Sequence, residues 1–515
     1  MSALPQTTPL ALHAAAQAYG SAPAVTDGSV RLSWAQLLDS VRETARVLIA
    51  QGVERGDRIG IWAPNTHHWI TAVLATHYVG AVIVPLNTRY VADEAADVLS
   101  RVRAKALFIV GEFLGRDRLA ELRADAPELT IDTVIVIPGD RDAAVENAIA
   151  WAELPKLAEA VTLGDAIARA ESVLPDDVSD ILFTSGTTGR SKGVLIPHTR
   201  ALTSARAWAD CATLNQQDRY LVVPPFFHSF GYKAGILASL VTGASIVPQA
   251  TFDVPETMRL IAAERITVLT GPPTIFQTIL EHPARATADL STLRVAVTGA
   301  ATVPVVLIER MRDELDFDVV LTAYGQTESG GFGTMCRPED SAETIANTCG
   351  RAIDGFEIKL ADNGELLLRS SQIMLGYLED PQATADTIDN DGWLHTGDVA
   401  VIDERGYMKV TDRLKDMYIS GGFNVYPAEV EQAMARLAGV AETAVIGVPD
   451  ERMGEVGKVY VVRKPGAELT ADDVLAHAKT LLANFKVPRF VEFRDQLPYS
   501  AAGKVLKRQL REEKA

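Results

Sequence analysis

A glycine-rich loop between two apolar runs constrains this chain more than any other stretch. Residues 181–183 and 194–196 are apolar, and the ten residues between them contain three glycines, five hydroxyl side chains, one arginine and Lys192. Glycines let backbone N–H groups approach a ligand closely, hydroxyls add hydrogen-bond donors, and the lysine adds a positive charge. The pattern predicts a strand, a tight anion-binding loop and a second strand, with phosphate as the favoured anion. A polar hairpin loop without a ligand is the alternative.

The loop differs from the Walker A loop of nucleotide-binding proteins. Ser191 stands five residues after Gly186, where the Walker A pattern requires a Gly-Lys pair. An apolar strand, rather than a helix, follows the loop. We therefore expect a phosphate-binding loop of another type.

The length and the charge of the chain limit what it can be. It has 515 residues, of which 47% are apolar and 23% charged, and its formal net charge is −18. A chain of this length exceeds one hydrophobic core and predicts about two to four domains. Its acidity argues against a nucleic-acid-binding surface, although local basic pockets are compatible with it. Three cysteines without CxxC spacing indicate neither a disulfide framework nor a zinc site.

The sequence contains no sign of a targeting or membrane segment. Its first residues lack a basic stretch followed by an apolar core, so no secretory signal is expected. No apolar run reaches the length that spans a bilayer. We expect a cytoplasmic protein with no membrane span and no nucleic-acid partner; a homodimer is compatible with the sequence.

Helical and extended patterns alternate through the first part of the chain. Residues 34–51 carry apolar side chains at helical spacing, whereas residues 58–64, 82–86 and 106–110 have the composition of buried strands. This alternation predicts an α/β fold with a largely parallel sheet and helices on its faces.

The character of the sequence changes after Gly350. Short strands and tight turns predict a small β-subdomain, and the last hundred residues predict a compact α+β unit. The expected domains are residues 1–411, a hinge at 412–416 and a C-terminal domain at 417–515.

Three segments, residues 268–276, 295–301 and 319–328, each have the pattern of a short apolar strand that runs into small or polar residues. Ligands of open α/β sheets bind at the carboxyl ends of the strands. These strand ends are therefore candidates for a binding pocket.

Five separated motifs resemble, in the same order, those of the adenylate-forming superfamily of acyl-CoA synthetases, adenylation domains and luciferases. They are the loop at 184–193, Tyr-Gly-Gln-Thr-Glu at 324–328, Gly-Asp at 397–398, Asp-Arg-Leu-Lys at 412–415 and Gly-Lys at 503–504. The resemblance covers essentially the whole chain, and five motifs are far more specific than the loop alone. It implies a large N-terminal α/β domain with a small β-subdomain, a mobile C-terminal α+β domain, and the use of ATP, Mg²⁺ and coenzyme A.

The resemblance also implies a role for individual residues of the ATP site. The triphosphate would be held by Thr184, Ser185, Gly186, Thr187, Thr188, Gly189 and Lys192. The adenosine and α-phosphate would contact Gly299, Ala300, Ala301, Tyr324, Gly325, Thr327, Asp398 and Arg413. Glu328, helped by Thr184, would bind Mg²⁺. Lys504 would bridge the carboxylate and the α-phosphate, so the catalytic candidates are Lys504, Thr327 and Lys192.

Taken singly, these residues also have ordinary structural explanations. Tyr324 could be a packed aromatic residue, Glu328 and Lys504 solvated charges, and Asp398 a turn former. Only their joint presence in the motifs favours the functional roles.

The implied reaction activates a carboxylic acid in two steps. The carboxylate attacks the α-phosphorus of ATP and releases diphosphate, and a thiolate then displaces AMP from the acyl-adenylate. The carboxylate is ionised at neutral pH, so the first step requires no general base, and positive charge at the phosphates is what the site must supply.

The second step implies a rearrangement. By resemblance, Lys415 is the hinge about which the C-terminal domain rotates, so that Ser420, Gly421, Gly422 and Phe423 admit coenzyme A. The glycines suit a close approach of the backbone to the pantetheine.

Residues 84–90, 226–236, 297–304 and 418–427 are similar to those of a narrower group, the CoA ligases of actinobacterial sterol-ring degradation. The group implies a compact bicyclic small-molecule acid with two ketones, 3-(7a-methyl-1,5-dioxo-octahydroinden-4-yl)propanoate (HIP). The candidates for its pocket are His228, Tyr232, Thr274 and Gly299, although His228 between aromatic residues fits a core histidine equally well. A medium-chain fatty or aromatic acid, and an enzyme that loads a carrier protein, are the alternatives.

Overall fold

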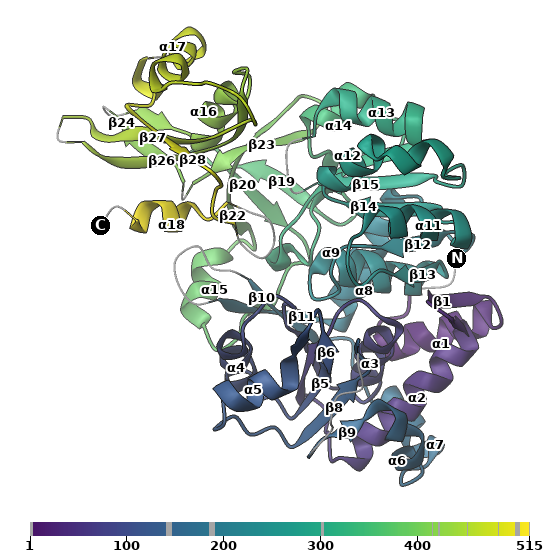
Figure 1. Cartoon of the computed structure of the whole chain (residues 1–515). Coiled ribbons are helices and arrows are strands. Elements are labelled where there is room, and N and C mark those ends of the chain that lie inside the picture. The colour runs from purple at the N-terminus through teal and green to yellow at the C-terminus, as the bar shows by residue number, and fades with distance from the viewer. Residues whose placement is uncertain are drawn as a thin grey trace. The chain divides into compact units, whose positions relative to one another are not determined.

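The computed structural model describes residues 4–140, 147–184, 191–299, 303–414, 416–420, 423–450, 452–482, 484–499 and 505–513 (Figure 1). The chain divides into two compact units. The first comprises Met1–Glu357 with Leu368–Leu394, and the second Ile358–Leu367 with His395–Ala515. Both combine helices with β-sheets, which confirms the predicted fold class. A division by compactness locates no hinge, so the boundaries at 411 and 417 stay a prediction.

An eight-stranded sheet of the first unit carries the two ends of the predicted anion-binding loop. Its order is β21-β11-β10-β4-β3-β5-β8-β9; the strands from β10 to β9 are parallel, and β11 and β21 are antiparallel to their neighbours. In this order the strands are Gly376–Tyr377, Lys192–Pro197, Val178–Thr184, Val82–Pro85, Arg58–Trp62, Ala106–Val110, Thr133–Ile137 and Ile149–Ala150. Helices α4 (Ala92–Arg101) and α5 (Arg118–Asp125) lie side by side against this sheet (Figure 1).

A nine-stranded sheet forms the other layer of strands in this unit. Its order is β18-β17-β16-β15-β14-β12-β13-β1-β2, and the strands from β16 to β1 are parallel. They are Arg351–Ala352, Thr334–Met335, Val319–Tyr324, Val295–Gly299, Val268–Gly271, Arg219–Val222, Ser245–Pro248, Pro23–Asp27 and Val30–Ser33. Figure 1 shows a row of helices along it: α11 (Val254–Glu264), α12 (Pro273–Glu281) and α13 (Val305–Leu315), with α14 (Ala342–Asn347) against α13.

Buried helices fill the space between the two sheets. Helix α3 (His67–Tyr78) contacts β1 of one sheet and β3 and β4 of the other, and it is buried from Trp69 to Tyr78. Helix α8 (His198–Cys211) contacts β10, β11 and η2, a π-helical turn (Tyr232–Leu237) that follows α9 (Ser229–Gly231) and continues into α10 (Ala238–Thr242). The other helices of the unit are α1 (Thr8–Tyr19), α2 (Trp34–Ala50), α6 (Leu154–Ala158), α7 (Leu163–Glu171) and α15 (Pro381–Thr387).

Helix α2 shows why the local predictions succeed. The Ser33 hydroxyl accepts a hydrogen bond from the Gln36 amide at 3.2 Å, and the Gln36 side chain accepts one from the Ser33 amide at 2.9 Å. This capping box makes Ser33 the N-cap, so the helix begins at Trp34, the first residue of the apolar pattern. The apolar face is buried, as its spacing predicted. The predicted helix at 34–51 is confirmed.

The second unit contains two smaller sheets. The first has the order β19-β20-β22-β23, with strands Glu357–Leu360, Glu365–Arg369, Leu394–Ile402 and Met408–Arg413. The second has the order β25-β24-β27-β26, with β28 paired to β27; its strands are Phe423–Val425, Tyr418–Ser420, Gly454–Arg463, Val440–Asp450 and Phe490–Arg494. Helices α16 (Pro427–Met434), α17 (Ala471–Leu481) and α18 (Lys507–Glu512) accompany the second sheet.

An ion pair lies in the interior of the first unit. Lys233 of η2 and Asp180 of β10 are both fully buried, and Nζ lies 3.2 Å from Oδ1. The Ser179 hydroxyl donates to the other oxygen of Asp180 at 2.8 Å. Burial raises the pKa of the Asp180 carboxyl and lowers the pKa of the Lys233 ammonium, because each charged form loses its hydration. The pair ties η2 to the strand that leads into the loop.

Removing one partner of this pair should destabilise the fold. Lys233→Met leaves the Asp180 carboxylate buried without its cation, which should lower the free energy of unfolding by about 3–5 kcal/mol. The measurement is urea unfolding followed by far-UV circular dichroism. The double variant Lys233→Met with Asp180→Leu should recover most of the loss, because no unpaired charge remains.

The matched control is Arg259→Met, which breaks an exposed pair with Glu256. Exposed pairs contribute about 0–1 kcal/mol, so this variant should unfold close to the unmodified protein. Equal losses in the single and double variants at position 233 would contradict the ion-pair explanation.

Candidate active site

The two ends of the glycine-rich loop are held together by a β-ladder. Thr184 at the end of β10 lies opposite Lys192 at the start of β11, and the Thr184 hydroxyl donates to the Lys192 carbonyl at 3.4 Å. The two strands predicted on either side of the loop are thus confirmed, whereas the anion-binding loop stays a prediction. Ser185, Gly186, Thr187, Thr188 and Gly189 lie outside them.

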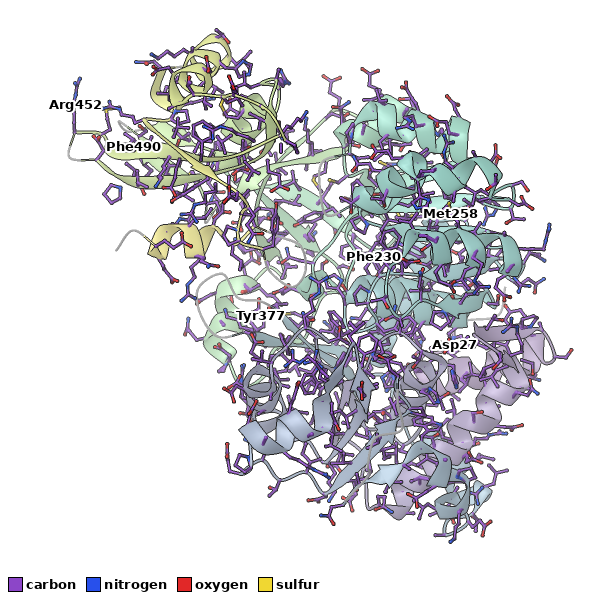
Figure 2. All side chains as sticks on the ribbon, in the orientation of Figure 1. Asp27, Phe230, Met258, Tyr377, Arg452 and Phe490 are labelled. Carbon is purple, nitrogen blue, oxygen red and sulfur yellow. The ribbon has the colours of Figure 1, made fainter. Side chains whose placement is uncertain are left out.

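Tyr377 connects this ladder to the candidate metal ligand Glu328. Strand β21 pairs with β11, and Figure 2 shows Tyr377 between α15 and the β10–β11 pair. The Lys192 ammonium lies 4.8 Å from the centroid of the Tyr377 ring, and the Tyr377 hydroxyl donates to Glu328 Oε1 at 2.9 Å. Three groups from distant parts of the sequence therefore meet: a lysine, a phenol and a carboxylate.

The surroundings fix the protonation of Tyr377 and the position of Glu328. Burial, and then the negative charge of Glu328, raise the pKa of the Tyr377 phenol, so it stays a hydrogen-bond donor at neutral pH. Glu328 lies in the 3-10 turn η4 (Thr327–Ser329), and its carbonyl accepts from the Met374 amide at 2.8 Å. The Glu328 carboxylate therefore extends from a turn that this backbone hydrogen bond holds in place.

Tyr377 is not among the site residues that the sequence predicted. Residues 373–378 form an apolar run with one tyrosine, which is typical of an ordinary buried strand. The signal that distinguishes it is the pairing of β21 with a strand some 180 residues earlier, and periodicity does not reveal pairing partners.

The carboxyl ends of β15 and β16 bring further candidates together. Gly299 pairs with Ala323, the residue before Tyr324, in adjacent parallel strands. Gly299, Tyr324 and Thr327 are half-buried. The carboxyl ends of these two candidate strands are therefore adjacent, whereas Ala300 and Ala301 lie outside the described residues.

Gly325 is required where the chain turns after β16. A Cβ atom on this residue would lie 2.2 Å from the Gly331 carbonyl oxygen and 2.5 Å from the Phe332 Cα. Both are backbone atoms, so any side chain would force the turn apart. The side-chain Nε2 of Gln326 donates to the Tyr324 hydroxyl at 3.3 Å, which orients the ring from the same turn.

The acyl-pocket candidates lie in contrasting environments. His228 is exposed, and its Nδ1 accepts from the Phe230 amide at 3.3 Å at the start of α9, so the core-histidine explanation is wrong. Tyr232 is fully buried, with its hydroxyl 3.4 Å from His77 Nε2. Thr274 is exposed in the first turn of α12. Their contact with a substrate stays a prediction.

In the second unit, Asp398 and Arg413 lie opposite each other in the β22–β23 ladder. Asp398 is only 5% exposed, and the preceding Gly397 has a positive φ of 71°, a backbone conformation that favours glycine. The Gly397 amide donates to Glu365 Oε1 at 2.9 Å. The side chain of Arg413 lies outside the described residues, so only its backbone position beside Asp398 is established.

The two ends of the predicted hinge segment, Asp412 and Asp416, are anchored within the second unit. Asp412 accepts from the Ala428 amide of α16 at 2.8 Å, and Asp416 pairs with Arg511 of α18 at 3.0 Å. Lys415 lies outside the described residues. The hinge itself therefore stays a prediction.

The predicted coenzyme A segment is a tight hairpin. Ser420 of β24 lies opposite Phe423 of β25, which leaves Gly421 and Gly422 as a two-residue connection. Gly421, Gly422 and the Phe423 side chain lie outside the described residues, and Ser420 is buried.

The catalytic candidate Lys504 also lies outside the described residues. Tyr499 and Val505 form an antiparallel bridge. The role of Lys504 stays a prediction.

The donor set of the first unit fits a hard divalent cation. Mg²⁺ prefers oxygen ligands and often binds through one or two carboxylates together with substrate phosphates. The Glu328 carboxylate, which keeps Oε2 beside the tyrosine-bound Oε1, and the Thr184 hydroxyl are such ligands. Within the described ranges no group of three or more His, Cys, Asp or Glu side chains could hold a metal ion.

No helix in the described part of the chain is long and apolar enough to cross a membrane.

Solved structures resemble the whole chain. ATP-bound MatB from Rhodopseudomonas palustris is 28% identical, with a TM-score of 0.84 over 99% of this chain and 98% of that one. A fatty acyl CoA synthetase from Mycobacterium tuberculosis is 31% identical, with a TM-score of 0.78 over 99% and 98%.

Sequence comparison agrees with this likeness. The chain is 57% identical, over 100% of both chains, to 3-[(3aS,4S,7aS)-7a-methyl-1,5-dioxo-octahydro-1H-inden-4-yl]propanoyl:CoA ligase of Rhodococcus jostii (strain RHA1). It is also 57% identical, over 94% of both chains, to the protein of that name from Mycobacterium tuberculosis (strain ATCC 25618 / H37Rv). Residues 12–378 match the AMP-binding enzyme family, and residues 429–504 match the AMP-binding enzyme C-terminal domain. The chain belongs to the AMP-binding enzyme family.

Proposed function

We propose that this protein is an ATP-dependent acyl-CoA ligase that converts HIP, ATP and coenzyme A to HIP-CoA, AMP and diphosphate in the cytoplasm. The observation that carries the proposal is 57% identity over the full length to a curated ligase of this acid. The cluster of Lys192, Tyr377 and Glu328 beside Thr184 supports it, because it supplies a cation, a donor and a metal ligand at the end of the loop.

The first step joins a carboxylate to the α-phosphorus and expels diphosphate with its electron pair. Lys192 offsets charge on the phosphates, and Thr327 contacts the α-phosphate. Mg²⁺, held by Glu328 and Thr184, would neutralise the triphosphate. Its carboxylate ligand is oriented by the Tyr377 hydroxyl. These groups favour the transition state because its charge is spread over the phosphate oxygens.

The second unit completes the proposed cycle. Asp398 would bind the ribose hydroxyls, and Lys504 would approach the carboxylate and the α-phosphate in the first step. Rotation about Lys415 would then bring the hairpin of Ser420 and Phe423 to the site. The thiolate sulfur of coenzyme A forms the thioester bond as AMP leaves with the electrons of the broken C–O bond.

Tyr377→Phe should weaken adenylation. The variant keeps the ring beside Lys192 but removes the donor to Glu328, and a hydrogen bond to a charged group contributes about 1.5–3 kcal/mol. We expect kcat/KM for MgATP, measured by diphosphate release, to fall on the order of 10- to 100-fold. Raising Mg²⁺ should restore part of the rate if the tyrosine acts through the metal ligand.

Tyr220→Phe is the matched control. It removes a buried hydroxyl that lies 3.0 Å from the Thr270 hydroxyl, away from the loop. Diphosphate release by this variant should stay within about twofold of the unmodified rate at room temperature. An unchanged kcat/KM in Tyr377→Phe would exclude the proposed role.

The acid specificity is tested with a panel of three acids. We expect kcat/KM for HIP to exceed the values for octanoate and benzoate by at least about 100-fold, because a pocket that pairs with ketone oxygens rejects acids that leave its polar groups unpaired. Coenzyme A consumption gives the rates. A preference for octanoate would assign the chain to medium-chain acids instead.

Lys504→Ala should separate the two half-reactions. Adenylation, followed by diphosphate release, should fall at least about 100-fold, because a cation at the developing charge is lost. Thioester formation from pre-made acyl-adenylate should stay within about threefold, because the lysine would act only in the first step.

Lys415→Pro gives the complementary pattern. A proline fixes φ and should hinder the rotation, so thioester formation should slow more than adenylation. Equal losses in both half-reactions for both variants would contradict the domain rearrangement.

A further inference from the structure

A cavity of about 480 Å³ lies in the first unit, on the face of the eight-stranded sheet that the proposed reaction does not use. Ile181 of β10, Leu195 of β11 and Leu378, which follows β21, contribute to its apolar wall. A volume of this size falls in the range of roughly 300–1,000 Å³ that is typical of small-molecule pockets.

The alternation of side chains along the strands separates this cavity from the candidate active site. Successive residues of a strand point to opposite faces, so Ile181 and Leu195 face away from Thr184 and Lys192. The packing around Gly193 confirms the shared face, because a Cβ atom there would lie within 3.3 Å of Ile181, Phe183 and Leu378. The cavity therefore lies behind the loop-bearing strands.

The apolar wall is incompletely covered. Helices α4 and α5 bury the centre of this face, in a cluster that includes Leu99, Val102 and Leu107. At the margin of that cluster, Leu195 and Leu378 are only partly buried. Half-buried leucines in a sheet, next to a cavity, leave room for an apolar body.

Four arginines line the cavity: Arg55, Arg58, Arg101 and Arg103. Only two carboxylates line it with them. Asp177 pairs with Arg55, and Glu379 pairs with Arg103 at 2.8 Å. Asp97, which is not part of the lining, pairs with Arg101 at 3.4 Å, so among the described residues Arg58 is the arginine of the four without a carboxylate partner.

Arg58 is the best-placed anion donor among the four. Its Nε donates to the Val102 carbonyl at 2.7 Å, and its Nη1 to the Gly56 carbonyl at 3.2 Å. Its recorded hydrogen bonds within the described residues are thus to carbonyls, which leave its charge uncompensated. A guanidinium fixed by two carbonyls retains further N–H groups for a carboxylate or phosphate.

We propose that this cavity binds an amphiphilic organic anion: an apolar body on the leucine wall and a carboxylate or phosphate group on the arginines. Neither feature alone selects this ligand. A purely apolar molecule would leave the arginines unused, and a small inorganic anion would leave the apolar wall exposed. The site is separate from the proposed ATP and acyl sites, so it goes beyond the proposed reaction.

Arg101 connects the cavity to the loop. Its guanidinium lies 4.9 Å from the centroid of the Phe183 ring, and its Nη1 lies 3.5 Å from the Ser191 hydroxyl. Phe183 and Ser191 directly precede Thr184 and Lys192, the two ends of the loop. An anion that attracts Arg101 should therefore change the KM for ATP.

The direct test uses 8-anilinonaphthalene-1-sulfonate as the probe and its uncharged relative N-phenyl-1-naphthylamine, with fluorescence titration of the full chain. We expect the sulfonate to bind at least about tenfold more tightly than the uncharged probe. Leu195→Trp, which fills the cavity, should weaken sulfonate binding at least about tenfold. Arg58→Gln should remove the preference for the charged probe, and Arg103→Gln on the exposed rim serves if Arg58→Gln fails to fold.

Matched controls separate this site from other binding. Val134→Trp enlarges a half-buried residue on β8 of the same sheet, and Arg259→Gln removes an exposed arginine on α11. Both should leave sulfonate binding within about twofold. Equal binding in all variants, or equal binding of both probes to the unmodified chain, would overturn the proposal.

Competition assigns the anionic group. Displacement of the sulfonate by 1-naphthoate or by 1-naphthyl phosphate supports the site and identifies the preferred head group, whereas displacement by neither overturns it. Saturation with the sulfonate should shift the KM for ATP at least twofold in the unmodified chain and not in Leu195→Trp. An unshifted KM would overturn the link through Arg101.

Discussion

The antiparallel pairing of β11 with β10, and of β21 with β11, is the constraint on which the candidate site depends. All other pairs of this sheet are parallel. A parallel pair needs a long crossover connection, which would not place the end of one strand opposite the start of the next. The antiparallel turn instead returns it at once, so Thr184 and Lys192 face each other. The added strand β21 then places Tyr377 against Lys192. The glycine-rich loop is thus held at both ends by hydrogen-bonded strands.

The two faces of this ladder carry different side chains: polar and charged on one face, apolar on the other. One face carries Thr184 and Lys192, together with the buried pair of Asp180 and Lys233. The opposite face carries the apolar side chains beside the arginine-lined cavity. Because strand periodicity is two, a one-residue slip in register would exchange these faces. Register, rather than composition, therefore determines which residues meet.

Local signals predicted much of this structure, and long-range pairing explains the rest. The helix at 34–51, the strands around the loop and the parallel strands β14 to β16 follow from periodicity, capping and turn residues. Local signals do not predict three other features: the contacts of Tyr377, the partner of Lys233, and the grouping of four arginines around one cavity. Each depends on segments far apart in the chain, and a pattern within one segment contains no information on its neighbour. The core-histidine explanation for His228 was wrong for a related reason, because aromatic neighbours in the sequence do not bury this residue.

The position of Glu328 carries a physical requirement of its own. A carboxylate beside a triphosphate is repulsive unless a cation lies between them, since two like charges about 4 Å apart at a protein surface cost several kcal/mol. The Lys192 ammonium lies over the Tyr377 ring, and the Tyr377 hydroxyl donates a hydrogen bond to one carboxylate oxygen of Glu328. In the proposed ATP site, the other carboxylate oxygen would serve as a ligand of a divalent ion. The tyrosine that keeps its proton at neutral pH is what holds that oxygen in place.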